Sequence, residues 1–459
     1  MKTKNKLTIG LVSLALIFSS CSKDSNQGDQ INPIDTTTDC NDVLNGTSML
    51  DDCGDCQLAY IYNMQTHDPQ AIVMLDDTAG IIVEYPEVII MPNDPMNPYW
   101  NAGCIPVPQT YKFSRMGQTT VNYTGQTTRL LMGIEMYNAL KDPSKTESEL
   151  LNMFNNGIGF GSVDFNGTTI DLDASEKTLG GKTAYYGSAT VKPRYDAMIT
   201  EAANVVFPAW NNGDFAEAGI AGEHTGVGGR TVYVDAKGLE IIQGFTKGLI
   251  GGLCVDQIVN GYLSTTKLNS GGNDASGLGA GAYTDMEHYW DEGFGYLYGL
   301  EADIEAPTYL GNNSVLLNKY AGQVNDEGDV NMNTVYNAFK AGRTAIINQD
   351  YTERDLQAAI VKEHVSKILG VKASYYLRKG AAIISGTSAD MAEFFHSVSE
   401  GYGFILSLQF ALDGSGNHIY SNTEVNTMLD TLMNGNGLWE IDAATLTSMA
   451  DDIDLRFGL

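Results

Sequence analysis

The chain has 459 residues, 43% of them hydrophobic, and its 56 acidic residues outnumber its 27 lysines and arginines, so the formal net charge is −29. This acidic balance argues against nucleic acid as a partner and against charge-driven binding to anionic lipid. The length and the apolar content are sufficient for one large hydrophobic core or two. No stretch after the first 20 residues is apolar over the roughly 18 positions that a transmembrane helix needs.

The first residues have the pattern of a secretory signal. Three lysines among the first six residues precede the apolar run Leu7 to Phe18, and two serines then lead to Cys21. The run is too short to span a bilayer. The pattern resembles a bacterial lipobox, which implies that residues 1–20 are a signal peptide and that Cys21 is lipidated. An ordinary signal, with Cys21 incidental, is the alternative.

A lipidated cysteine implies a membrane partner and a place in the cell envelope. The mature chain would be an outer-membrane lipoprotein, anchored to the membrane by acyl chains rather than spanning it, on the periplasmic or the outward face. Residues 21–38 are polar and poor in hydrophobic residues, and they predict a flexible tether.

Residues 39–105 predict a small β module rich in disulfides. An even set of clustered cysteines in an oxidising compartment indicates disulfides, with three possible pairings; the candidates are Cys40, Cys53, Cys56 and Cys104. The β-branched runs AIVMLDD, GIIVEY and EVIIMP predict strands. A zinc site at Cys53 and Cys56 is a weaker alternative.

The stretch DCNDVLNGTSMLDDCGDC resembles the acidic, cysteine-punctuated repeats of thrombospondin type 3, in which aspartates in tight loops bind calcium. The resemblance implies a calcium ion held by carboxylate oxygens, which hard cations prefer. The candidate ligands are Asp39, Asp42, Asp51, Asp52 and Asp55. A spacer or docking role without calcium is the alternative.

Residues 106–459 predict an all-α domain of helical bundles. Leucine and methionine at a spacing of three to four predict a helix in TTRLLMGIEMYNALKD. Further helices are expected near 145–156, 193–206, 235–265, 284–300, 330–348, 352–378, 388–411, 422–433 and 441–453. Thr284 and Glu287 form a capping box, and Thr387 or Ser388 is expected to cap the later helix. Cys254 lies in an apolar stretch and is expected to be a buried, unpaired thiol.

One phrase occurs twice in this domain. HYWDEGFGYLYGL begins at His288 and HSVSEGYGFILSL begins at His396, and the two agree at histidine, glutamate, two glycines and the final leucine. Histidine is scarce in this chain, with six in all. The repetition therefore predicts an internal duplication, with two related halves in residues 106–459.

Each copy places an imidazole and a carboxylate on one helix face, because positions four apart share a face. Imidazole with hard carboxylates suits iron or another divalent metal, and helix bundles use such elements to hold iron or manganese. The predicted metal ligands are His288, Glu292, His396, Glu400, Asp291, Glu240 and His364. The alternative is structural, since an i,i+4 pair stabilises a helix by about 0.2–0.5 kcal/mol. Arg343, flanked by apolar residues, is expected to pair with a carboxylate.

The stretches VPQTYKFSRMGQTTVNYTGQTTRLLMGIEM, YTDMEHYWDEGFGYLYG and FFHSVSEGYGFILSL resemble an uncharacterised family of secreted Gram-negative lipoproteins, a domain of unknown function. The resemblance covers roughly residues 106–459. It implies an association with imelysin-type proteins, which are helical and linked to iron. The imelysin hallmark is Gly-x-His-x-x-Glu. Here Met286 replaces the glycine and Asp291 stands three residues after His288, which weakens the transfer of a metal site.

These patterns predict a lipid-anchored binding protein that takes part in iron, haem or other metal acquisition, with an outer-membrane transporter or an imelysin-type protein as partner. The alternative is a glycan- or nutrient-binding surface lipoprotein that works with such a transporter. Four tryptophans give no sign of a large aromatic sugar platform. An enzyme is less expected, because the phrase lacks the paired histidines of His-Glu-x-x-His and no nucleophile constellation is evident.

Overall fold

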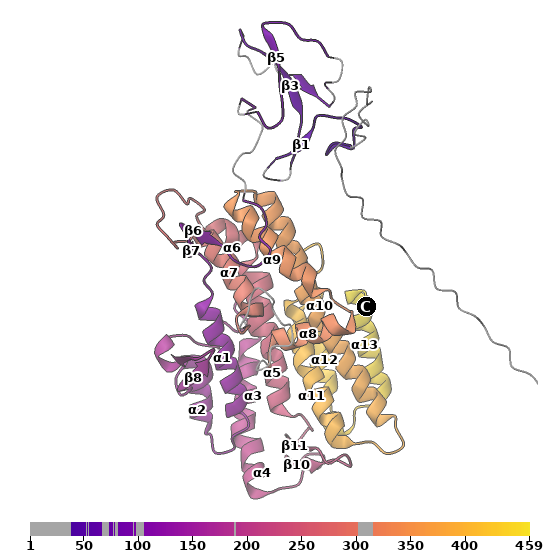
Figure 1. The fold of residues 1–459 in the computed structure, drawn as a ribbon. Coiled ribbons are helices and arrows are strands. Elements are labelled where there is room, and N and C mark those ends of the chain that lie inside the picture. Colours follow the sequence, from indigo (N-terminus) through magenta and orange to yellow (C-terminus); the bar gives the residue numbers. More distant parts are fainter. Residues whose placement is uncertain are drawn as a thin grey trace, which may run out of the picture. The chain divides into compact units, whose positions relative to one another are not determined.

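The computed structural model describes residues 38–51, 53, 55–66, 73–76, 78, 81–94, 96–97, 105–187, 190–301 and 315–459. They fall into two compact units that divide between residues 102 and 103 (Figure 1). The predicted signal peptide, Cys21 and almost all of the tether lie outside the described residues, as do Asp52 and Cys104.

The first unit is built on short antiparallel strands. Strand β3 (Ala59–Asn63) lies between β4 (Val73–Leu75) and β5 (Glu87–Ile90), and β1 (Met49–Leu50) pairs with β2 (Cys56–Gln57). The runs AIVMLDD and EVIIMP contribute β4 and β5, as predicted. GIIVEY forms no strand over its described residues 81–85, and β3, which was not predicted, supplies the centre of the sheet and the buried Ala59 and Tyr60.

A disulfide joins Cys40 to Cys56, 16 residues apart, and Cys53 is also disulfide-bonded. Two of the predicted calcium ligands hold tight loops here. Asp39 accepts hydrogen bonds from the backbone of Asn41, Val43 and Ser48, and Asp51 accepts them from Cys53 and Asp55. These bonds secure both loops without a cation, and calcium binding stays a prediction.

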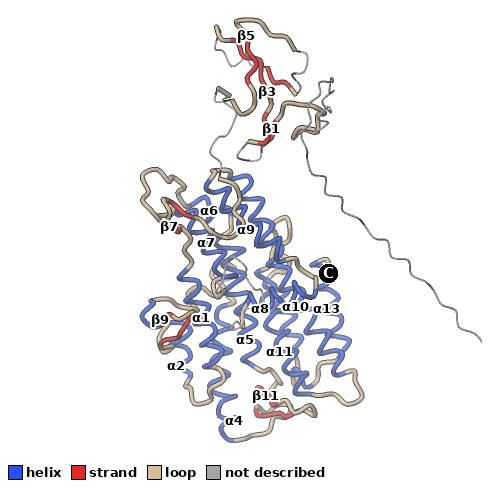
Figure 2. The backbone as a smooth tube through the Cα atoms, in the orientation of Figure 1, coloured by secondary structure: helices blue, strands red, loops and turns tan. Residues whose placement is uncertain are grey.

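The second unit is mainly helical (Figure 2). Its shorter helices are α2 (Glu147–Leu151), α3 (Lys192–Glu201), α4 (Phe207–Asn212), α5 (Ile241–Leu249), α6 (Thr265–Ser270), α8 (Leu317–Glu327) and α12 (Asn422–Leu432). Its longer helices are α1 (Thr124–Ala139), α7 (Asp285–Tyr298), α9 (Met332–Ile347), α10 (Tyr351–Ile384), α11 (Met391–Ser407) and α13 (Ala443–Phe457). Wider π-type turns follow α2, α3 and α5, and those after α5 cover Ile250–Val255 and Gln257–Tyr262.

Local sequence explains where the two repeated helices begin. The Thr284 hydroxyl accepts a hydrogen bond from the backbone N–H of Glu287, and the Glu287 carboxylate accepts one from the backbone N–H of Thr284, so the predicted capping box is confirmed at α7. Helix α11 begins differently from the prediction. Its cap is Asp390, which accepts from the backbone of Glu393, rather than Thr387 or Ser388. A carboxylate there also complements the positive end of the helix dipole.

The all-α prediction for this unit needs a correction, because its described residues include three antiparallel hairpins. They are β6 (Ser114–Arg115) with β7 (Gln118–Thr119), β8 (Ser162–Phe165) with β9 (Thr168–Asp171), and β10 (Gly222–Thr225) with β11 (Thr231–Val234). The last begins in a predicted loop and ends just before the helix predicted over 235–265, whose first helical residue is Ile241. Gly229, with φ of 83°, makes its turn, because glycine adopts positive φ at little cost.

Helix α10 packs against α9, α11 and α13, while α11 also packs against α5. Helix α7 packs against α1 and α9. In Figure 1 the hairpin β10–β11 lies at one end of this bundle and β6–β7 at the other. Cys254 is buried and unpaired, as predicted. Among the described residues no helix is both long enough and apolar enough to cross a membrane.

Candidate functional site

Asp291, one of the predicted metal ligands, belongs to a buried ion cluster. It accepts hydrogen bonds from the Tyr111 hydroxyl (2.7 Å) and from Arg343 Nε (3.1 Å), and Arg343 Nη1 also bonds Glu287 (2.9 Å). Burial raises the pKa of Asp291 and Arg343 opposes that rise. The prediction that Arg343 pairs with a carboxylate is confirmed. Asp291 already has a cationic partner, which favours a structural role, and metal binding by Asp291 stays a prediction.

The first His–Glu pair lies on α7, as the spacing predicted. His288 Nε2 is 3.9 Å from Glu292 Oε1, and the same oxygen accepts a hydrogen bond from Gln126 of α1 (2.9 Å). The His288 ring stacks on Tyr283, with centroids 4.7 Å apart. Its Nδ1 is buried and has no hydrogen-bond partner in the described part of the chain. Both members of the pair line a cavity of about 470 Å³.

The second pair, on α11, is part of a ring of side chains shared with α5. His396 Nδ1 is 2.7 Å from Glu240 Oε2, and His396 Nε2 is 3.9 Å from Glu400 Oε2. Glu400 pairs with Lys247 Nζ at 3.1 Å. Lys247 donates to Gln243, and Gln243 donates to Glu240, which closes the ring. A carboxylate only accepts, so Nδ1 carries the proton toward Glu240.

The charged side chains of this ring lie within 4 Å of one another, pair by pair. Burial alone would raise the pKa of Glu400, but Lys247 and His396 hold it below 4.5. Glu240 and Glu400 carry two negative charges, Lys247 supplies one positive charge, and His396 adds another when it is protonated. With a neutral His396 the ring keeps one net negative charge, and an imidazolium at His396 would balance it.

The repeated glycines have the same use in both copies. A methyl group on Gly295 would lie 2.4 Å from Tyr123 Cβ at the start of α1, and one on Gly403 would lie 2.5 Å from Lys247 Cβ in α5. In each copy the glycine lets a neighbouring helix approach the His–Glu face closely. The phrase thus encodes a helix contact as well as a polar pair.

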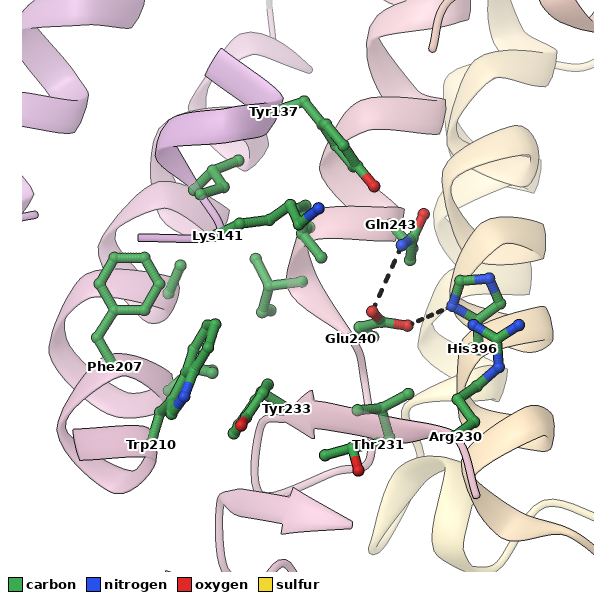
Figure 3. A pocket seen from close by; sticks show the side chains of 16 residues that line it. Tyr137, Lys141, Phe207, Trp210, Arg230, Thr231, Tyr233, Glu240, Gln243 and His396 are labelled. Carbon is green, nitrogen blue, oxygen red and sulfur yellow. Dashed lines mark hydrogen bonds and ion pairs between the residues drawn. The ribbon is translucent and has the colours of Figure 1, made fainter. Parts of the chain in front are cut away.

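A second cavity, of about 310 Å³, lies beside Glu240 and His396 (Figure 3). One wall is aromatic: Phe207 and Trp210 come from α4 and Tyr233 from β11. The rings of Trp210 and Tyr233 stack with centroids 3.7 Å apart and planes 13° apart. Across the cavity lie the polar side chains of Glu240, Gln243, His396 and Arg230. Tyr137, in α1, and Lys141, just after the end of α1, also line the cavity.

This cavity can hold a ligand that has both flat apolar faces and many polar groups. The aromatic wall offers a packing surface, while the facing carboxylate, amide, imidazole and guanidinium both accept and donate hydrogen bonds. Pockets of this size with a few convergent polar groups are the usual small-molecule sites of proteins. Arg230 is held in place by Glu393, whose Oε2 lies 2.6 Å from Arg230 Nε.

The structure brings together some of the predicted ligands and not others. Glu240, His396 and Glu400 meet, whereas His288 and Glu292 line a different cavity. His364 bonds the backbone oxygen of Ile360 on its own helix and lines neither cavity. Among the described residues no group of three or more His, Cys, Asp or Glu side chains is placed to hold a metal ion.

Sequence reasoning missed the aromatic half of the second cavity. Trp210 and Tyr233 come from a helix end and a hairpin that are separated in the chain, and nothing in the pattern links them. A tighter interpretation of TVYV, residues 231–234, as a strand would have placed Tyr233 and Thr231 on one face. Lys141, at the end of α1, carries no signal of its own.

Comparison with known proteins gives one result. Neither a curated protein nor a solved structure shows significant similarity to this chain. The sequence profile of one family matches residues 108–459, which is nearly the whole helical unit and most of the chain. The chain belongs to the family described as "Domain of unknown function (DUF4856)".

Proposed function

We propose that this protein is a lipid-anchored binding protein of the cell envelope and that it binds a small saccharide in the cavity beside Glu240 and His396. The observation that carries the proposal is the composition of that cavity, with stacked Trp210 and Tyr233 facing a cluster of hydrogen-bonding side chains. A sugar ring has apolar C–H faces and a rim of hydroxyls, so it matches both walls. The signal-like N-terminus supports an anchor at Cys21. Delivery of the ligand to an outer-membrane transporter is part of the proposal.

Metal acquisition is the second candidate, and one observation favours it. Glu240 accepts the Nδ1 proton of His396, the carboxylate–imidazole arrangement that orients histidine ligands in metal sites. One observation argues against it. Glu400 already bonds Lys247, whose ammonium group supplies the positive charge that a metal cation would otherwise supply. Binding of iron or another divalent metal therefore stays a prediction that ranks second.

The two candidates separate in one set of titrations on the full-length protein. Calorimetry with glucose, galactose, N-acetylglucosamine, maltose and cellobiose should detect binding of at least one sugar. Trp210→Ala should weaken that binding tenfold or more, because it removes the stacking wall. Trp439→Ala is the matched control, since Trp439 packs against Phe395 and does not line the cavity.

Binding of none of these sugars, or equal binding by Trp210→Ala, contradicts the saccharide proposal. The metal candidate predicts something different. Metal analysis would find stoichiometric iron, manganese or zinc, which His396→Ala removes while Trp210→Ala retains it.

A further inference from the structure

The cavity beside His288 is positively charged, in a protein whose net charge is −29. Three basic side chains line it, Arg129, Lys177 and Lys182, against a single carboxylate, Glu292. The remaining lining side chains are largely neutral and polar, and they include Asn122 and Ser175. Basic residues are outnumbered two to one in the whole chain, so their concentration here runs against the composition.

In the described part of the chain these three cations form no ion pair with a carboxylate. Arg129 bonds the backbone oxygens of Thr178 and Gly125, and the Lys182 ammonium lies over the rings of Tyr185 and Tyr262. Lys267, nearby, lies over the Tyr289 ring at 3.7 Å. Partial burial lowers the pKa of Lys182, and the charges of Arg129, Lys267 and Lys177 lower it further, while the Glu292 carboxylate opposes this change. These cations repel one another, and an anion between them would relieve that repulsion.

The start of α1 also faces this cavity. Thr124, Gly125 and Gln126, the first three residues of this 16-residue helix, line it. The N–H of Thr124 donates to Asn122 Oδ1 and that of Gln126 to the Tyr123 carbonyl, so Gly125 is the one of the three whose N–H has no hydrogen-bond partner among the described residues. A methyl group on Gly125 would lie 3.5 Å from both Arg129 Nη1 and Lys177 Cε, so both basic side chains reach the helix end. A helix N-terminus attracts anions through its free N–H groups and its dipole.

Glu292 does not neutralise the site. Its carboxylate accepts a hydrogen bond from Gln126 and lies 3.9 Å from His288. Three cations and one carboxylate leave an excess of two positive charges, before any contribution from His288. That excess matches a doubly charged anion better than a single carboxylate.

We propose that the cavity lined by Arg129, Lys177 and Lys182 at the N-terminus of α1 is a binding site for a phosphate group carried by a small molecule or by a lipid headgroup. Arg129 and the two lysines supply charge-assisted hydrogen bonds to phosphate oxygens, and the helix end adds its dipole and the N–H of Gly125. The space of about 470 Å³ exceeds a bare phosphate, so an organic group extends along the polar wall. This site is separate from the saccharide cavity and does not depend on it.

Calorimetry on the full-length protein tests the proposal, with inorganic phosphate, glucose 6-phosphate and glucose as probes. Cosedimentation with phosphatidylglycerol vesicles, compared with phosphatidylcholine vesicles, tests the lipid source. Binding of glucose 6-phosphate without vesicle binding assigns a soluble phosphate ester, and preference for phosphatidylglycerol assigns a headgroup. Failure of the phosphate probes and of the anionic vesicles overturns the proposal.

Variants then locate the site. Lys182→Met should weaken binding of the phosphate probe at least about tenfold, because one charge-assisted hydrogen bond is lost. Lys145→Met, which removes the same charge outside both cavities, should leave it unchanged. Glu292→Gln should tighten binding, since it removes the repulsive carboxylate; a metal site there would be weakened instead. Equal affinities in Lys182→Met and the unmodified protein, or weaker binding by Glu292→Gln, contradict the proposal.

Discussion

Glu240 Oε2 and His396 Nδ1 lie 2.7 Å apart, although the two residues are 156 positions apart in the chain. This contact joins α5 to α11 at the edge of the proposed saccharide cavity. Both side chains are largely buried, with 13% and 17% of their surface exposed. The hydrogen bond therefore contributes to the fold as well as to the site.

The coupling between these two residues can be measured by a double-mutant cycle. We expect Glu240→Gln and His396→Gln to show an interaction free energy of about 1–2 kcal/mol in urea unfolding, since a hydrogen bond to a charged group contributes about that much. Strict additivity of the two single variants would mean that the contact does not stabilise the protein.

Arg343 is expected to be the most sensitive charged residue of the core. Arg343→Met leaves the buried Asp291 without its cationic partner and removes a cationic partner of Glu287. It should lower the free energy of unfolding by about 3–5 kcal/mol. Arg378→Met is the control, because Arg378 pairs with Asp451 and Asp454 at the surface and should cost less than about 1 kcal/mol. Similar losses for both variants would refute this account of the cluster.

Asp256 is expected to make stability depend on pH. Burial raises its pKa to about 6 from 3.8, although Tyr186 and Asn260 donate hydrogen bonds that lower it. Between these two values the folded protein binds more protons than the unfolded chain, so the free energy of unfolding falls as pH rises from 4 to about 6. The total fall is on the order of 2–3 kcal/mol.

Asp256→Asn should remove that fall. The free energies of unfolding of Asp256→Asn and of the unmodified protein are to be measured in urea at pH 4, 5, 6 and 7. The value for the variant, relative to that for the unmodified protein, should rise up to about pH 6 and then level off. Burial also raises the pKa of Asp235 to about 6, so both proteins keep some dependence of the unfolding free energy on pH. Parallel curves would show that Asp256 is not responsible.

Local patterns in the sequence predicted much of the helical unit. The capping box at Thr284, the spacing of the His–Glu pairs and the carboxylate partner of Arg343 follow from rules that act within a few residues or within a buried environment. The hairpin β10–β11 was missed because its strands are short and its glycine-rich turn has the composition of a loop.

The sequence could not show which cavity each pair faces. Helical periodicity places His288 and Glu292 on one face, but it does not say that Arg129 and Lys182 lie opposite. The same holds for His396, whose neighbours Trp210 and Tyr233 come from other elements. Two similar phrases therefore line cavities of different chemistry, one aromatic and one cationic.

The repeated glycines give a fourth prediction. Gly403→Ala and Gly295→Ala push a methyl group into the adjacent helix and should each lower the free energy of unfolding by about 1–3 kcal/mol. Gly279→Ala is the control, because a methyl group there meets nothing within 4 Å. If the repeated glycines tolerate alanine as Gly279 does, close helix approach does not explain their repetition.

The most direct test of the central claim compares the two equivalent histidines in one saccharide titration. The sugar that binds the unmodified protein should bind His396→Gln at least about tenfold more weakly, because His396 lines the aromatic cavity. His288→Gln should bind it with unchanged affinity, because His288 lines the other cavity. Loss of affinity in His288→Gln alone, or in neither variant, would contradict a saccharide site beside Glu240 and His396.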